Sequence, residues 1–264
     1  MIRRIALLAA VLALAACGSP RPPVADLPAP GAGAVAPPNF GDADPHPWDG
    51  RKPQSYAVHG TDVSRFQTAV DWQGARAAGV NFVFIKATEG ADNTDPMFRD
   101  HWRAARAAGV PAGGYHFWYH CAPGRAQARN FIAQVPKARG ALPPVLDIEW
   151  TPTSPTCTRR TPQDELLRET QAFVDALRRH YGQVPLVYVT PDIFQDRELW
   201  RLRGVEFWLR SVAAHPGDLH PGKPWTFWQY SGTGLIPGIA GKADLNLFHG
   251  SVAQWNAWRA ARAQ

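Results

Sequence analysis

The sequence is poor in cysteine and lacks an apolar run long enough to cross a membrane. Its 264 residues include only 3 cysteines. The apolar run at residues 5–16 is too short for a stable transmembrane helix. Because this run follows Arg3 and Arg4, it predicts a signal peptide over residues 1–16.

The end of this predicted signal peptide resembles a bacterial lipobox. Small residues precede Cys17, and Gly18 follows it. The pattern predicts an exported lipoprotein with lipid on Cys17, anchored to a membrane. Gly18 in place of Asp favours the bacterial outer membrane or periplasm. Secretion with a free Cys17 is the alternative.

The two remaining cysteines, Cys121 and Cys157, reach an oxidising compartment if the chain is exported. We therefore predict a disulfide between them, which stabilises the fold by roughly 3–4 kcal/mol through the unfolded chain. A metal site is the rival interpretation. No histidine stands at ligand spacing to them, so we expect no metal and no cofactor.

The sequence also lacks a stripe of Lys and Arg interleaved with aromatic residues. Its net charge of +6 therefore does not predict a nucleic-acid partner. Removal of residues 1–16 lowers this charge by two, because Arg3 and Arg4 are lost. The remaining excess is compatible with an anionic polymer, and equally with an ordinary solvated basic surface.

Composition divides the rest of the chain into two parts. Residues 17–55 are rich in Pro, Ala and Gly and have hardly any large apolar side chains before Trp48. Such a segment predicts a disordered tether. Residues 56–264 are predicted to form one catalytic domain.

An internal repeat indicates the architecture of that domain. Residues 72–80 (WQGARAAGV) recur as residues 102–110 (WRAARAAGV), and each copy predicts an amphipathic helix that ends at a glycine. A strand follows each copy at once. Residues 163–181 form a third predicted helix, which Gly182 ends before another strand. Repeated helix–glycine–strand units predict a parallel sheet with helices outside.

Eight strands are predicted, near residues 57–62, 82–87, 112–117, 144–149, 185–190, 206–210, 225–230 and 243–247. The connections between the last three show little helical pattern. The fold class is therefore predicted to be α/β, an irregular TIM-like (β/α) barrel whose last helices are missing. An open doubly wound sheet is the alternative, but no Gly-rich phosphate loop follows the first strand.

Polar and aromatic residues cluster where the predicted strands end, which is where barrels of this kind place their active sites. They are Asp62, Lys86, Glu89, Tyr115, His116, Asp147, Glu149, Tyr188, Trp208, Arg210, Gln229, Asp244 and Asn246. The interior of a packed barrel is normally apolar. The cluster therefore predicts a functional site.

The sharpest element of the cluster is Asp147-Ile148-Glu149. Alternate residues of a strand face the same side, so both carboxyl groups are expected to point one way. Two neighbouring carboxylates repel, so one keeps its proton near neutral pH, as a general acid for glycosidic cleavage requires. A purely structural role in binding arginine or backbone groups is the alternative.

Tryptophans supply a second signal, because sugar rings stack on aromatic faces. Trp118, Trp150, Trp208, Trp225 and Trp228 stand at or beside strand ends, and packing remains an alternative role for them. Trp72, Trp102, Trp255 and Trp258 stand at helical positions and are predicted to pack. His116 is expected to be a hydrogen-bonded wall residue, and it need not converge with His120 on a metal.

Six segments occur in the order seen in glycoside hydrolase family 25, the Chalaropsis-type lysozymes. They are residues 60–64 (GTDVS), 84–90 (FIKATEG), 114–117 (GYHF), 146–149 (LDIE), 228–231 (WQYS) and 244–246 (DLN). The resemblance covers roughly residues 56–250. It implies an irregular eight-stranded barrel that hydrolyses the β-1,4 bond between N-acetylmuramic acid and N-acetylglucosamine in peptidoglycan glycan strands, with no metal or cofactor.

By motif position, the resemblance implies that Glu149 is the general acid/base. Asp147, Asp62 and Asp244 are implied as supporting carboxylates. The implied mechanism is retaining and substrate-assisted, with the acetamido oxygen of the sugar attacking the anomeric carbon; an aspartate nucleophile is the alternative. We place substrate contacts on Glu89, Lys86, Tyr115, Tyr188, Trp208, Arg210 and Gln229.

Two of these contacts have rival roles. Glu89 could instead form an ion pair with Lys86. Arg210 could meet the lactyl carboxylate of muramic acid or pair with an internal carboxylate. The sequence departs from the family pattern at Thr68, at Asn93 and at residues 207–211, which leaves the substrate detail open.

Two other functions compete with the muramidase. One is a non-catalytic module that binds cell-wall glycans on the same barrel, and the other is a hydrolase of another acetamido-sugar polymer such as chitin. Retention of all four carboxylates favours an enzyme. We expect a monomer.

Overall fold

The computed structural model describes residues 34–262. The predicted signal peptide, Cys17 and the first part of the predicted tether lie outside these residues. The strands are β1 Gly41–Asp42, β2 His59–Val63, β3 Val83–Glu89, β4 Asn93–Thr94, β5 Ala112–Phe117, β6 Val145–Ile148, β7 Leu186–Val189, β8 Glu206–Arg210, β9 Phe227–Leu235 and β10 Ala243–Phe248. The helices are η1 Pro53–Ser55, α1 Trp72–Ala77, α2 Phe98–Ala107, α3 Gly124–Gln134, α4 Gln163–Tyr181, α5 Pro191–Asp196, η2 Leu199–Arg201, α6 Pro216–Leu219 and α7 Val252–Ala260.

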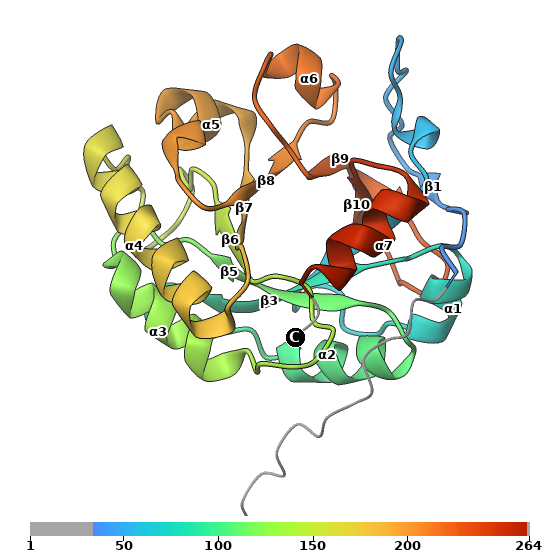
Figure 1. The fold of residues 1–264 in the computed structure, drawn as a ribbon, viewed down its shortest axis with the longest axis horizontal. Coiled ribbons are helices and arrows are strands. Elements are labelled where there is room, and N and C mark those ends of the chain that lie inside the picture. The colour runs from blue at the N-terminus through green and yellow to red at the C-terminus, as the bar shows by residue number, and fades with distance from the viewer. Residues whose placement is uncertain (1–33, 263–264) are drawn as a thin grey trace, which may run out of the picture.

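Eight strands close into a barrel, which confirms the predicted fold class (Figure 1). The ring runs β9–β10–β2–β3–β5–β6–β7–β8, and pairing of β8 with β9 closes it. Each of the eight overlaps a predicted strand. β10 differs from the expected parallel arrangement, because it runs antiparallel to both β9 and β2. The barrel is therefore mixed.

Helices α1 to α4 cover the outside of the barrel between parallel strands (Figure 1). α4 shows why: its buried side chains, from Leu166 through Phe173 to Tyr181, recur at helical spacing. It ends at Gly182, whose φ of 68° is left-handed. The repeated helices α1 and α2 likewise end before Gly79 and Gly109, at φ of 102° and 78°.

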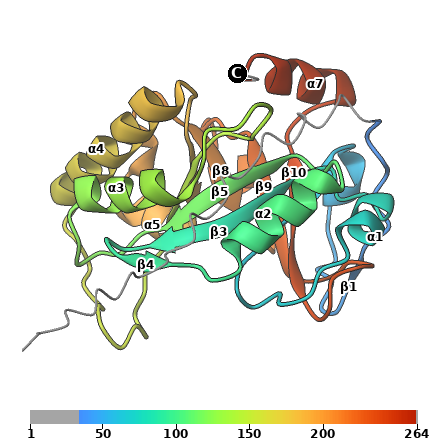
Figure 2. The same cartoon turned by 90° about the horizontal axis from the view of Figure 1, so that it is seen from below.

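The later connections carry short helices or none, as the sequence predicted. α5 and α6 are short, and no helix lies between β9 and β10. α7 follows β10 and lies across one end of the barrel (Figure 2). A capping box of Ser251 and Gln254 begins it, and the Trp255 ring packs against Phe248 and Phe82.

Residues 34–55 differ from the tether predicted for them, because they pack against the barrel. β1 pairs with β9, and the Trp48 ring lies edge-on to Trp228 with centroids 5.1 Å apart. Asn39 donates its backbone N–H to Ala78 O at 2.8 Å. A few apolar side chains suffice here because β9 and β10 have no helix of their own to cover them.

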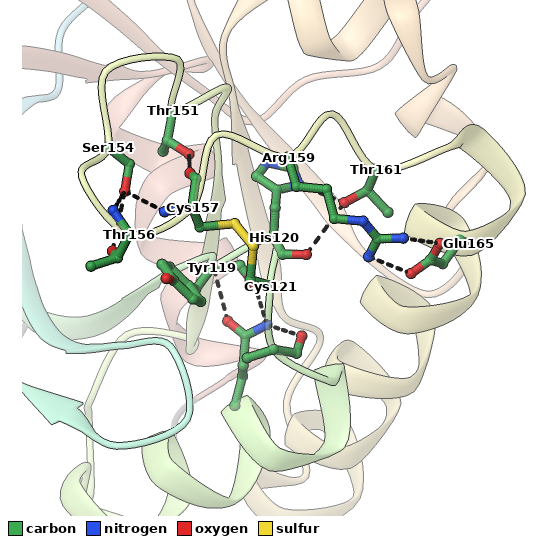
Figure 3. The surroundings of a disulfide bond; sticks show 12 residues. Tyr119, His120, Cys121, Thr151, Ser154, Thr156, Cys157, Arg159, Thr161 and Glu165 are labelled. Atoms are coloured by element: carbon green, nitrogen blue, oxygen red, sulfur yellow. Dashed lines mark hydrogen bonds and ion pairs between the residues drawn. A yellow bond between two sulfur atoms is a disulfide. The ribbon is translucent and has the colours of Figure 1, made fainter.

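The predicted pair Cys121–Cys157 forms a disulfide, with Cα atoms 6.0 Å apart. It joins the loop after β5 to the loop after β6 (Figure 3). Between residues 34 and 262, none of the helices is both long enough and apolar enough to cross a membrane.

Candidate active site

A cavity of about 280 Å³ opens at the end of the barrel where the parallel strands terminate. Every predicted catalytic or substrate-binding residue except Glu89 lines it. The lining consists of Asp62, Ser64, Phe66, Lys86, Tyr115, Phe117, Asp147, Glu149, Tyr188, Trp208, Arg210, Gln229 and Asp244. The structure thus brings residues from strands across the whole barrel into one hollow.

Asp244 reaches this cavity by a route that differs from the expected one. It stands at the beginning of β10, not at its end. Because β10 runs antiparallel to β2, Asp244 lies opposite Asp62 in the register. The start of this one strand therefore meets the ends of the others.

A buried hydrogen-bond network holds Asp62. Its Oδ1 accepts the side-chain amides of Asn246 at 2.7 Å and Gln229 at 3.1 Å. The Tyr188 hydroxyl donates to Gln229 Oε1 at 2.8 Å, and the Trp208 indole donates to Asn246 Oδ1 at 3.0 Å. These outer bonds fix both amides with their N–H groups toward Asp62. The network thus presents a carboxylate in one orientation.

Asp62 and Asp244 are hydrogen-bonded to each other, and they share a proton. Burial, and then the negative charge of Asp62, raise the pKa of Asp244 to about 9. Burial also raises the pKa of Asp62, but the amides of Asn246 and Gln229 oppose this. Asp244 therefore donates as the neutral acid, and Asp62 accepts as the carboxylate.

Asp147 and Glu149 form a second pair of interacting carboxyl groups. Asp147 is the third residue of β6, and Glu149 follows the strand directly. Burial and then the charge of Glu149 raise the pKa of Asp147 well above its ordinary value, while Lys86 opposes the shift. Burial raises the pKa of Glu149 too, and the positive charge of Arg210 opposes it. The pair therefore holds a proton to a higher pH than an isolated carboxyl group.

The cationic residues of the site behave differently from each other. Lys86 Nζ forms an ion pair with Glu89 Oε2 at 2.7 Å and lies 4.6 Å from the centroid of the Phe117 ring. Glu89 thus takes the rival position foreseen for it, beside the cavity. Arg210 forms no salt bridge within the described residues, and its charge acts on Glu149 and Asp244.

The aromatic residues divide between the cavity and the packing of the fold. Trp208 lines the cavity, whereas Trp118 and Trp228 are 2% and 0% exposed and do not reach it. Trp228 packs outward against the N-terminal segment. The four tryptophans at helical positions are buried or half-buried, as predicted.

Sequence reasoning missed Phe66 and gave Asn246 no role. Phe66 lines the cavity and is 75% exposed, which is unusual for so large an apolar side chain. The available signal was a large aromatic residue two positions after the motif GTDVS of residues 60–64. Asn246 is fully buried, and only the network around Asp62 reveals its function.

The histidines near the site are structural. His116 is fully buried and bonds to Thr88 Oγ1 at 2.7 Å and Gln127 Oε1 at 2.9 Å, as expected for a wall residue. Among residues 34–262, no group of His, Cys, Asp and Glu is arranged to hold a metal ion.

The barrel and its paired carboxylates define the class of a carboxylate-dependent glycoside hydrolase. Residues 61–239 match the family described as "Glycosyl hydrolases family 25". The chain belongs to this family and is a glycoside hydrolase.

Individual relatives agree. The N,O-diacetylmuramidase of Chalaropsis sp is 32% identical over 207 residues, 74% of this chain and 95% of that protein. The uncharacterized protein YegX of Escherichia coli K12 is 32% identical over 213 residues, 79% of this chain and 75% of that protein. A solved family 25 glycosyl hydrolase from Bacillus anthracis superposes with a TM-score of 0.70 at 29% identity, over 82% of this chain and 98% of that one.

Proposed function

We propose that this glycoside hydrolase is a muramidase that cleaves the β-1,4 bond between N-acetylmuramic acid and N-acetylglucosamine in peptidoglycan. The observation that carries the proposal is the convergence of Asp62, Asp147, Glu149 and Asp244 on one sugar-sized cavity. The muramidase from Chalaropsis, similar over most of its length, supports the choice of substrate.

In the proposed reaction the proton that the Asp147–Glu149 pair holds passes through Glu149 to the glycosidic oxygen as the bond to the anomeric carbon breaks, which leaves both groups as carboxylates. The acetamido oxygen of the muramic acid attacks that carbon from the opposite face, and Asp147 stabilises the positive charge that develops on the acetamido group. Glu149, now a carboxylate, then removes a proton from the water that opens the ring intermediate. Configuration is retained, because the anomeric carbon is attacked twice.

Other side chains are assigned to substrate binding. The exposed ring of Phe66 offers an apolar face to a sugar. Arg210, which lacks a salt bridge among the described residues, is placed to meet the lactyl carboxylate of muramic acid. Export and a lipid anchor on Cys17 complete the proposal, and they place the enzyme next to the cell wall.

Digestion of purified peptidoglycan tests this function. Mass spectrometry of the products should find muramic acid at the new reducing ends. Glu149→Gln should lower kcat by about 10²–10⁴-fold, because the amide cannot donate the proton. Glu165→Gln is the matched control, since Glu165 binds Arg159 outside the cavity. N-acetylglucosamine at the reducing ends, or normal cleavage by the Glu149 variant, would refute the assignment.

A further inference from the structure

The end of the barrel opposite the cavity carries mainly positive charge. We call it the entry pole, and it comprises the ends of the connections that lead into β3, β5, β6, β7 and β8, the chain after β10 and the start of the described chain. These are residues 34–40, 77–82, 108–111, 135–144, 178–185, 202–205 and 249–262. They contain no Asp or Glu. Their basic residues are Lys137, Arg139, Arg178, Arg179, Arg203, Arg259 and Arg262.

Most of this charge is not neutralised inside the protein. Lys137, Arg139, Arg178, Arg179 and Arg203 are exposed. None of them takes part in a salt bridge within residues 34–262. In the sequence, the acidic residue closest to these segments is Glu206, the first residue of β8. Glu206 forms a salt bridge with Arg262.

The helix dipole explains only part of the pattern. Arg178 and Arg179 stand in the last turn of α4, where a positive charge offsets the dipole. Lys137, Arg139 and Arg203 stand in loops, beyond the ends of α3 and η2. Their exposure, and the absence of Asp and Glu from the segments of the pole, point to an external anionic partner.

The described chain begins at this same pole. Ala34 lines a hollow of about 400 Å³ together with Trp255 and Arg259, and Ala36 exchanges hydrogen bonds with Asn81 at the entrance to β3. Figure 2 shows α7 at this end of the barrel and β4, which follows the cavity end of β3, at the other. Residues that precede Ala34 therefore join the domain on the side away from the active site.

We propose that the entry pole contacts the anionic phospholipid headgroups of a bilayer and so turns the cavity toward the cell wall. The segments of this surface contain exposed basic residues and no Asp or Glu, and Ala34, where the described chain begins, lies among them. If Cys17 carries lipid, as in the proposed function, residues 18–33 can separate the pole from the membrane by at most about 55 Å. The electrostatic contact itself does not depend on that lipid.

Vesicle sedimentation tests the contact without the anchor. The protein is the chain from residue 18 onward, which retains every described residue; a solved relative that superposes over 98% of its own length shows that such a barrel folds by itself. Vesicles contain 30% phosphatidylglycerol in phosphatidylcholine, and vesicles of pure phosphatidylcholine are the reference. We expect binding only to the anionic vesicles, and expect it to weaken as salt rises from about 50 to 300 mM.

A matched pair of variants locates the contact. The triple variant Lys137→Gln, Arg139→Gln, Arg203→Gln should bind the anionic vesicles roughly 100-fold more weakly, at about fivefold per cation. The control Lys52→Gln, Arg125→Gln, Lys242→Gln removes the same charge from exposed residues outside the pole and should bind nearly as the parent does.

Three outcomes would overturn the proposal. They are absence of binding at low salt, an equal loss in both triple variants, and binding to purified peptidoglycan that depends on the pole while vesicles are ignored. Hydrolysis of soluble peptidoglycan fragments by both triple variants is measured in parallel. Loss of vesicle binding with intact hydrolysis separates this inference from the proposed function.

Discussion

Asp62 and Asp244 hold one proton between two carboxyl groups inside the cavity, and this couples stability to pH. The pKa of Asp244 is about 9 in the folded protein, against an ordinary value of 3.8. Between these pH values the folded chain keeps a proton that the unfolded chain loses. The contribution of this group to stability is therefore complete below about pH 4 and is lost as the pH rises toward 9.

Asp244→Asn should remove this dependence, because an amide stays neutral and still donates to Asp62. We expect the variant to unfold at a temperature about 2–4 °C higher than the parent at pH 8, a gain on the order of 1 kcal/mol. The difference should vanish near pH 4. Thermal unfolding at both pH values measures it, with the exposed Asp92→Asn as control. If the unfolding temperatures of parent and variant changed with pH in the same way, the two carboxyl groups would not share a proton.

The disulfide acts on the loop that carries Glu149. Next to Cys121, His120 donates from Nε2 to Glu149 O at 2.9 Å and accepts at Nδ1 from Thr161 Oγ1 at 3.0 Å. Cys157 and Thr161 stand in the loop after β6 (Figure 3), and Glu149 is the first residue of this loop. Two loops are thus fastened together beside the general acid.

Replacing both cysteines by serine should lower the free energy of unfolding by about 3–4 kcal/mol, because the disulfide restricts the unfolded chain. Urea denaturation with and without a reductant measures the effect. The parent protein in reductant should behave like the double variant, and the double variant should not respond to the reductant. An unchanged midpoint in the reduced parent would show that the disulfide contributes nothing to stability.

The N-terminal segment replaces a missing helix on the outside of β9 and β10. Trp48 packs against the barrel through Trp228. Trp48→Ala should destabilise the domain by about 2 kcal/mol, less than for a fully buried tryptophan, because Trp48 is only half-buried. Chemical denaturation tests this, with the exposed Lys52→Ala as control. Equal stability of both variants would mean that residues 34–55 merely rest on the barrel.

Over the whole molecule, charge and function are arranged along the barrel axis. The cavity end of the barrel carries the four carboxylates and the exposed Phe66, whereas the segments of the entry pole contain basic residues and no Asp or Glu. The barrel topology produces this separation, because every loop that enters a parallel strand falls at the same end. Residues of the active site and residues of the entry pole can therefore be substituted independently of each other.

Much of this arrangement could be predicted from local patterns. The predicted helix at residues 163–181 coincides with α4, and Gly182 ends it as expected. All residues predicted to be catalytic or to bind substrate, except Glu89, line one cavity. They could be predicted because the alternation of residues along a strand and the ends of strands can be recognised in the sequence. What failed depended on packing partners. Trp228 and Trp208 look alike beside their strands, yet one faces the N-terminal segment and the other the barrel interior.

The sequence by itself determined the eight strands, the positions of the glycines that end the helices and the family, because each depends on short runs of neighbouring residues. It also determined the disulfide pair, because only two cysteines follow Cys17. Only the tertiary structure decided the direction of β10, the packing of residues 34–55 and the network that holds Asp62. These depend on contacts between residues far apart in the chain, such as Asp244 with Asp62 and Trp48 with Trp228. Such contacts form only when the barrel closes.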